Sequence, residues 1–309
     1  MCKHDFVKFI SLSIILFLYK NNRYLFLLII MITIFSCETR TELNLPEIQP
    51  KIVLNSFFNP DSLFRINLTL SKLKNSRDFN LINKWTYINN ADIRLFVDNE
   101  IITDFIFKNK GNFVSSAYKP IAGKEYTIQI KYTDYQEIEA KSLIPEKITI
   151  DSLYYSFIED ESGSKMLKVN IIWNDPPEQN FYYIFVIKEE QYYGYKESPA
   201  IFLRNNTIFG DWTTGQSLMV FDDKIFNNHY FNFDMLLNYD VAQFGPTYYI
   251  FYLVHLSKDF YLWAESQNRY FQQNTFFDEP VIVYNNIKNG LGIFAGCNIS
   301  CDTISFNDY

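Results

Sequence analysis

The sequence predicts a mainly β protein built from two β-sandwich-like domains. Aromatic side chains are abundant, with 23 Tyr and 30 Phe in 309 residues, and together with the many Ile and Thr residues they suit a half-buried pleated surface. Residues 64–71 and 126–132 alternate strictly between apolar and polar side chains, which is typical of a strand with one buried face. A chain of 309 residues is also long enough for about two domains.

The amino-terminal segment predicts a lipoprotein signal peptide over residues 1–36. Residues 20–23 are polar and basic, and residues 24–35 are almost wholly apolar. This run is short of the roughly 20 residues that cross a bilayer as a helix, but it matches the core of a signal peptide. Residues 34–37 (IFSC) resemble a lipobox, although Phe35 departs from the usual small or aliphatic residue there. We therefore expect cleavage before Cys37, lipidation of Cys37 that includes palmitate, and attachment to a membrane through that lipid.

Residues 37–50 are polar and contain two prolines, which predicts a tether. The first domain follows over residues 51–146, and Pro145 closes it. Turn chemistry at Asp98-Asn99 and Lys110-Gly111 separates short alternating runs, as expected of a β-sandwich. The predicted strands cover residues 51–58, 64–71, 91–98, 101–108, 112–117, 126–132 and 136–144.

Residues 147–309 predict a second β-rich domain with one helix. Ser257 is a good N-cap, with Asp259 in the first turn, for a helix at about 258–273. The apolar residues of this helix recur at helical spacing, which indicates core contact. The predicted strands cover residues 148–158, 166–173, 181–189, 217–221, 247–256, 280–284 and 291–294.

The cysteine and histidine pattern predicts no metal site and no cofactor. Cys297 and Cys301 are the only cysteine pair in the folded part, and they can form a disulfide if a turn brings them together, because a strand would hold them too far apart. They have no histidine close in sequence, so they fall short of a zinc site. His255 lies in an apolar run and is interpreted as a core histidine, whereas His229 lies in a polar loop.

The sequence also predicts no enzyme. The sequence contains no nucleophile elbow, zinc-protease helix, phosphate-binding loop or dinucleotide fingerprint. Asp222 and Asp223 are adjacent, so on a strand they would point to opposite faces, and we interpret them as part of a polar loop. The net charge of −7 and the absence of a basic block argue against nucleic acid as a partner.

Several segments, taken in order, resemble a family of Bacteroidota-type outer-membrane lipoproteins, domain of unknown function 4249. Residues 122–126 (AGKEY) are also similar to transthyretin-like and carboxypeptidase-regulatory sandwiches, and residues 173–183 are similar to a fibronectin-like sandwich with insertions. The segments that carry the family resemblance are Cys37 with its polar tether, 50–54 (PKIVL), 90–93 (NADI), 122–128 (AGKEYTI), 150–155 (IDSLYY), 175–183 (DPPEQNFYY) and 286–294 (NIKNGLGIF).

The resemblance implies a lipid-anchored outer-membrane protein, on the periplasmic or the cell-surface side. It also implies an accessory to a TonB-dependent receptor in ligand uptake. The alternative is a structural or adhesive surface lipoprotein with no transport role. Flat aromatic side chains suit stacking on a ligand, so exposure of the second-domain aromatics at one end would favour binding, and their burial would favour the structural role. These candidate ligand-binding residues are Tyr192, Tyr193, Tyr195, Trp212 and Tyr230. We also expect the first domain to fold when the second is removed.

Overall fold

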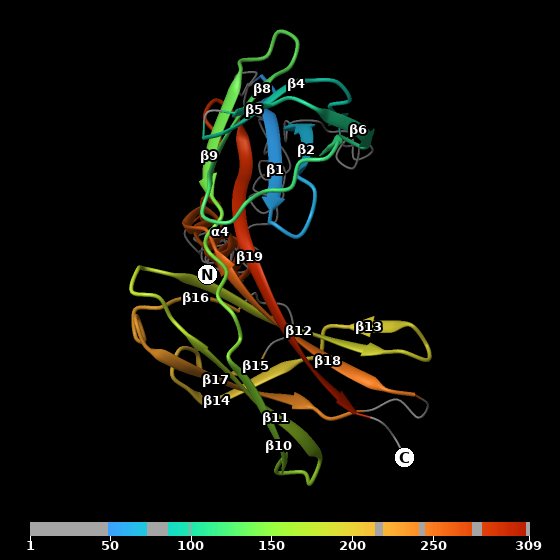
Figure 1. The fold of residues 1–309 in the computed structure, drawn as a ribbon, viewed down its shortest axis with the longest axis vertical. Coiled ribbons are helices and arrows are strands. Elements are labelled where there is room, and N and C mark those ends of the chain that lie inside the picture. The colour runs from blue at the N-terminus through green and yellow to red at the C-terminus, as the bar shows by residue number, and fades with distance from the viewer. Residues whose placement is uncertain are drawn as a thin grey trace, which may run out of the picture. The chain divides into compact units, whose positions relative to one another are not determined.

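The alternating segments of the sequence form strands in the computed structural model (Figure 1). The residues described are 49–72, 86–98, 100–213, 219–240, 245–273 and 280–306, and within these the side chains of 204, 205 and 210–213 are not described. The predicted signal peptide, Cys37 and most of the tether therefore lie outside the described residues.

The largest sheet has ten strands, in the order β13-β12-β18-β19-β1-β2-β7-β6, with β3 paired to β2 and β16 paired to β12. Its strands are β1 (Ile52–Phe58), β2 (Arg65–Leu70), β3 (Thr86–Tyr87), β6 (Phe105–Asn109), β7 (Asn112–Ser115), β12 (Phe181–Glu190), β13 (Tyr195–Glu197), β16 (Met219–Asp222), β18 (Thr247–Leu256) and β19 (Leu291–Phe306).

Two smaller sheets accompany it. The four-stranded sheet has the order β5-β4-β8-β9, and the five-stranded sheet has the order β10-β11-β17-β14-β15. Their strands are β4 (Asp92–Val97), β5 (Glu100–Ile102), β8 (Glu125–Lys131), β9 (Ile138–Leu143), β10 (Ser152–Glu159), β11 (Lys165–Asn174), β14 (Ile201–Asn206), β15 (Gly210–Thr213) and β17 (Tyr230–Asn238).

Each smaller sheet contributes to a separate apolar core with part of the ten-stranded sheet. In the first core, Leu54 and Leu68 from the large sheet cluster with Ile128 from the four-stranded sheet. In the second core, Tyr182 from the large sheet clusters with Phe233 from the five-stranded sheet. Such face-to-face burial is the arrangement of a β-sandwich, so the predicted mainly β, sandwich-like class is confirmed.

Strand β19 contributes to both sandwiches. Its first part pairs in parallel with β1, from Val53↔Leu291 to Phe58↔Gly296, and its second part pairs antiparallel with β18, from Leu256↔Cys297 to Thr247↔Phe306. Ile287 and Phe294, which the sequence assigned to the second domain, belong to the first core. This participation argues against the expectation that residues 51–146 fold alone, because without residues 287–296 they lack two core side chains and one of the two strands that pair with β1.

In segment 286–294, one of those that carry the family resemblance, the backbone lies close to β1. Gly292 has φ +113°, and a Cβ there would lie 2.0 Å from the carbonyl oxygen of Leu54. The Asn286 side chain bonds twice to Phe294, donating to its carbonyl at 2.7 Å and accepting from its N–H at 3.0 Å. The segment is therefore a structural requirement of the crossing strand.

The helix predicted after Ser257 is present as α4 (Lys258–Phe271). The Ser257 hydroxyl accepts a hydrogen bond from the N–H of Phe260 at 3.2 Å, which caps the helix. Phe260 also packs on Phe57 of β1, with ring centroids 4.7 Å apart. The capped helix therefore covers part of the outward face of the large sheet.

Some element predictions were wrong. Residues 280–284 form no strand, although the sequence predicted one. The predicted strand 291–294 runs on to Phe306, and β17, which begins directly after His229, lies in a segment for which no strand was predicted. The strand predicted at 217–221 corresponds to β16.

Candidate functional site

The hairpin of β12 and β13 presents three of the candidate tyrosines to solvent. Register places Glu190 opposite Tyr195, and Gly194, with φ +61°, supports the connecting turn. Tyr192 and Tyr193 lie in that turn and Tyr195 begins β13, with exposed fractions of 69%, 58% and 51%. Together, these three side chains form the tyrosine surface of the hairpin.

A buried lysine forms the base of this surface. Alternation along β12 turns Tyr182, Ile184 and Val186 toward the second core, and Lys188 occupies the next inward position. Only 3% of its side chain is exposed. A buried ammonium is costly unless it is paired, so its surroundings determine whether the hairpin is stable.

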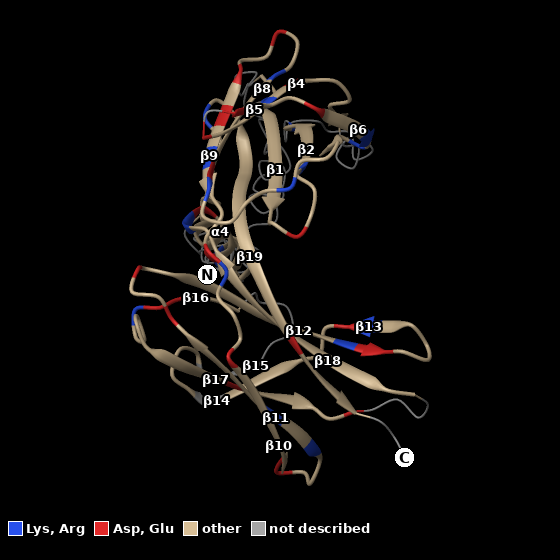
Figure 2. Ribbon diagram, in the orientation of Figure 1, with Lys and Arg blue, Asp and Glu red and all other residues tan. Residues whose placement is uncertain are grey.

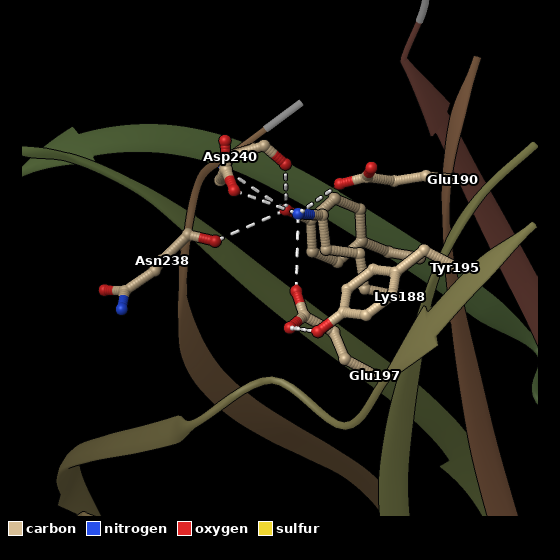
Figure 3. Close-up of polar contacts among 7 residues, drawn as sticks. Lys188, Glu190, Tyr195, Glu197, Asn238 and Asp240 are labelled. Carbon is tan, nitrogen blue, oxygen red and sulfur yellow. Dashed lines mark hydrogen bonds and ion pairs between the residues drawn. The ribbon is translucent and has the colours of Figure 1, made fainter. Parts of the chain in front are cut away.

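Three carboxylates surround the Lys188 ammonium (Figure 3). Its Nζ lies 3.0 Å from Asp240, 3.0 Å from Glu190 and 3.3 Å from Glu197. Burial lowers the pKa of Lys188, but the bonds to Glu190 and Asp240 outweigh burial and hold that pKa above its usual value. The lysine therefore stays charged and ties β12, β13 and the residues after β17 together.

Two tyrosine hydroxyls extend this ion cluster. Tyr195, at the exposed surface, donates to Glu197 at 3.2 Å, and this bond raises the pKa of Tyr195 (Figure 3). The buried Tyr249 donates to the carbonyl oxygen of Asp240 at 2.8 Å. All three carboxylates form ion pairs with Lys188, so the arrangement anchors the tyrosine surface.

Both signs of charge surround the tyrosines. Figure 2 shows red and blue segments together on β12 and β13, where Glu189 pairs with Lys196 at 2.7 Å. Around Lys188, three carboxylates face one ammonium, so the immediate base of the surface carries an excess of negative charge.

The structure does not bring all five candidate aromatics together. Tyr230 is 72% exposed, but it lies opposite Asn174 at the end of β17. That end is near Tyr182, whose hydroxyl donates to Asp175, whereas the tyrosine surface begins beyond Glu190. Tyr182 and Glu190 are eight positions apart on β12, about 26 Å at roughly 3.3 Å per residue. Tyr230 is therefore not part of the surface.

Trp212 lies on β15 opposite Leu203, and its side chain is outside the described residues.

A second polar cluster closes the other end of the second sandwich. Asp175 accepts the hydroxyl proton of Tyr182 and the N–H of Asn228 at 2.9 Å, and burial raises the pKa of its carboxyl. Asp223 accepts the N–H of Asn180 at 2.7 Å. Both carboxylates are 1% exposed, so they satisfy buried backbone groups.

The remaining polar candidates have local partners. Asp222 pairs with Lys224, so the two adjacent aspartates serve different contacts. The His255 Nδ1–H donates to the carbonyl oxygen of Glu146 at 2.8 Å, as expected of a core histidine, and burial lowers its pKa. His229 is exposed and has Nδ1 2.7 Å from the carbonyl oxygen of Asn227.

The disulfide that a turn would have allowed between Cys297 and Cys301 is not formed. Cys297 is buried, Cys301 is exposed, and both thiols are free. They lie four positions apart on the single strand β19, which separates their Cα atoms by about 13 Å, far beyond the roughly 7 Å limit for a disulfide. The turn that the disulfide required is absent from β19.

Neither a metal cluster nor a membrane-spanning helix occurs among the described residues. No three His, Cys, Asp or Glu side chains there lie together so as to hold a metal ion. Within the same residues, no helix has the length and apolarity to cross a bilayer.

Sequence reasoning missed the ion cluster at the hairpin. The sequence did contain a sign of it. Lys188 follows the alternate apolar residues of its strand that face inward, and a lysine at such a position needs charged partners. The partners themselves, Glu197 and Asp240, could not be found from spacing, because Asp240 lies 52 residues away.

No curated protein matches the chain in a sequence comparison. The model of the family described as domain of unknown function (DUF4249) matches residues 38–302, and the chain therefore belongs to that family.

Proposed function

We propose that the chain is a lipid-anchored cell-envelope binding protein of the outer membrane, accessory to a TonB-dependent receptor in ligand uptake. The lipobox at Cys37 supports the anchor, and the tyrosine surface supports the binding role. The proposal includes no catalytic step.

The observation that carries the proposal is a group of exposed tyrosines on a hairpin whose strands the Lys188 ion pairs join. Tyr192, Tyr193 and Tyr195 are all more than half exposed on one hairpin, and the buried Lys188 cluster fixes its strands. Tyrosine is enriched at protein interfaces because it supplies large contact area at low entropic cost. A hairpin that is already ordered loses little further entropy on binding. We assign the receptor protein as the partner of this surface.

The test is a crosslinked pull-down of the full-length lipoprotein from outer membranes, followed by mass spectrometry. The variant Tyr192→Ala/Tyr193→Ala/Tyr195→Ala is compared with the wild type. The matched control is Tyr154→Ala/Tyr230→Ala, which removes two tyrosines that are 60% and 72% exposed elsewhere. We expect stoichiometric recovery of a TonB-dependent barrel with the wild type and the control, and at least a tenfold loss with the triple variant.

Two results would contradict this proposal. Recovery of an acylated protein without a barrel would favour the structural or adhesive role. Equal recovery of the barrel with the triple variant would place the contact elsewhere.

The anchor is tested separately with Cys37→Ala. We expect this variant to leave the membrane fraction, and we expect the wild-type Cys37 peptide to carry acyl chains in mass spectrometry. Retention of the variant in the membrane fraction would overturn the anchor. Because Cys37 lies outside the tyrosine surface, this result is independent of the pull-down.

A further inference from the structure

A polar hollow lies on the outward face of the large sheet in the first sandwich. Its volume is about 330 Å³, within the range of small-molecule sites. The lining residues are Asn55, Asn67, Thr69, Tyr87, Lys110 and Asn112.

Strand register gathers the three asparagines into one row. Asn55 of β1 lies opposite Asn67 of β2, and Asn67 lies opposite Asn112 of β7. Directly opposed residues on neighbouring strands have Cβ atoms about 4.5–5.5 Å apart. Their chain neighbours Leu54 and Leu68 face the first core, so the asparagines face away from it.

Thr69 and Tyr87 extend the row along the strand direction. Thr69 lies two positions after Asn67 on the same face, and register places Tyr87 opposite it. Thr69 is 4% exposed, which places it deep in the hollow, whereas Tyr87 is 36% exposed at its side. The hollow thus combines a hydroxyl at depth with an aromatic ring.

Internal hydrogen bonds orient part of the lining and leave the rest unused. The Asn67 Nδ2 group donates to Asn112 Oδ1 at 2.9 Å and to the carbonyl oxygen of Lys110 at 3.0 Å, so both of its protons are used. Asn67 therefore presents its Oδ1 as an acceptor. Among the described residues, the side chain of Asn55 has no hydrogen-bond partner, which leaves both a donor and an acceptor for a ligand.

This set of groups selects a neutral ligand with hydroxyl groups. Among the described residues that line the hollow there is no carboxylate for a cation, and the neighbouring strand β1 carries no charged residue, as its tan colour shows (Figure 2). Lys110 is the single charged group among the described lining residues, and the donors of Asn67, which an anion would need, are already used. Amides that donate and accept, beside a ring that stacks on C–H groups, match a sugar.

We propose that this hollow binds a neutral saccharide of one or two units. Asn55 and the Asn67 acceptor bond its hydroxyls, and Tyr87 stacks on its ring. The inference does not depend on the receptor proposal, because none of the lining residues belongs to the tyrosine surface.

The experiment is saturation-transfer NMR on the mature chain carrying Cys37→Ala. The probes are neutral disaccharides of glucose, galactose, mannose and N-acetylglucosamine, with glucuronate and glucose 6-phosphate as charged probes. We expect saturation transfer to at least one neutral disaccharide, and affinity at least tenfold weaker in Asn55→Leu and in Tyr87→Ala.

The matched control is Asn170→Leu. Asn170 is also an asparagine in a cross-strand amide pair, donating to Asn232 at 3.0 Å, but it lies on β11 of the other sandwich, outside the hollow. The Asn170→Leu variant should bind the neutral disaccharide with wild-type affinity, and so should the variant that lacks the three tyrosines of the tyrosine surface. Circular dichroism of each variant confirms that a loss of binding is not a loss of folding.

Three results would overturn the proposal. These are no transfer to any neutral disaccharide, transfer that Asn55→Leu leaves unchanged in a folded protein, and transfer confined to the charged probes and lost in Lys110→Ala.

Discussion

The ammonium of Lys188 lies 3.0 Å from the carboxylate of Asp240, although 52 residues separate them in the chain. Lys188 sits on a strand of the ten-stranded sheet, and Asp240 follows the last residues of β17 in the five-stranded sheet. The pair therefore joins the two sheets of the second sandwich at the edge that carries the tyrosine surface.

Replacing Lys188 with methionine should destabilise the protein. The substitution leaves Glu190, whose side chain is 16% exposed, without its cation. Removing one partner of a buried pair costs about 3–5 kcal/mol. Because Asp240 and Glu197 can turn to solvent, we expect a loss of about 2 kcal/mol in the free energy of unfolding, measured by urea titration. The control Lys196→Met removes an exposed pair of the same hairpin and should cost less than about 1 kcal/mol. Equal losses would show that Lys188 is not the anchor.

Replacing Gly292 with alanine should prevent stable packing of β19. The new Cβ would meet the carbonyl oxygen of Leu54 at 2.0 Å, a contact that only a backbone shift relieves. Gly163 is the matched control, because it also has a positive φ, +80°, but an added Cβ there would meet no atom within 4 Å. We expect Gly163→Ala to lose about 1 kcal/mol from its backbone conformation, and Gly292→Ala to lose several kcal/mol more. Thermal unfolding of both variants gives the comparison, and similar midpoints would contradict the described crossing.

The two thiols should differ strongly in reactivity. Burial, with a smaller effect from the Asp61 charge, raises the pKa of Cys297 to about 12, so almost no thiolate forms at neutral pH. Cys301 is exposed. In the mature chain carrying Cys37→Ala, we expect a maleimide to label Cys301 in the native state and Cys297 only after unfolding. Failure of both to react until a reductant is added would reveal a disulfide and contradict the structure.

His255 should make stability depend on pH below about 6.5. Burial lowers its pKa in the folded state from the usual value of 6.5, so on acidification the unfolded chain takes up the proton first. Stability is therefore fully present above pH 6.5 and is lost as the pH falls toward the lowered folded pKa, by up to about 1.4 kcal/mol per pH unit.

His255→Asn removes this titration and keeps a donor for the carbonyl oxygen of Glu146. The variant should lose less stability than the wild type between pH 7.5 and pH 5.5, as measured by urea unfolding at each pH. The exposed His229 provides the control, because His229→Asn should follow the wild type. Parallel behaviour of His255→Asn and wild type would remove His255 as the cause.

The sequence predicted those elements whose burial follows local alternation. The runs containing β2 and β8 alternate because one face meets a core and the other does not, and the helix after Ser257 has its own cap. β17 was missed because three successive residues near its end, Leu236 among them, are buried, which breaks the period-2 pattern. The prediction of a strand at 280–284 was wrong, because a short apolar run does not show whether a neighbouring strand is present to pair with it.

The candidate site was predictable only in part. Tyr192, Tyr193 and Tyr195 are close in sequence and lie on one hairpin, so local reasoning placed them together. Tyr230 was grouped with them from composition alone, and strand register places it opposite Asn174, next to the Asp175 that binds Tyr182, away from the tyrosine surface. The asparagine row was not predicted, because Asn67 and Asn112 become neighbours only through the pairing of β2 with β7.

The participation of β19 in both cores also sets the order of events during synthesis. A ribosome delivers the amino-terminal strands first, yet Ile287 and Phe294 of the first core, and the parallel partner of β1, come from near the end of the chain. At a synthesis rate of roughly 5–20 residues per second, these residues are made on the order of ten seconds after β9, and the first core is incomplete until then. During that interval β1 has an unpaired edge, which is open to mispairing. A nascent chain with this topology therefore needs its early strands kept apart from other chains until its last strand arrives.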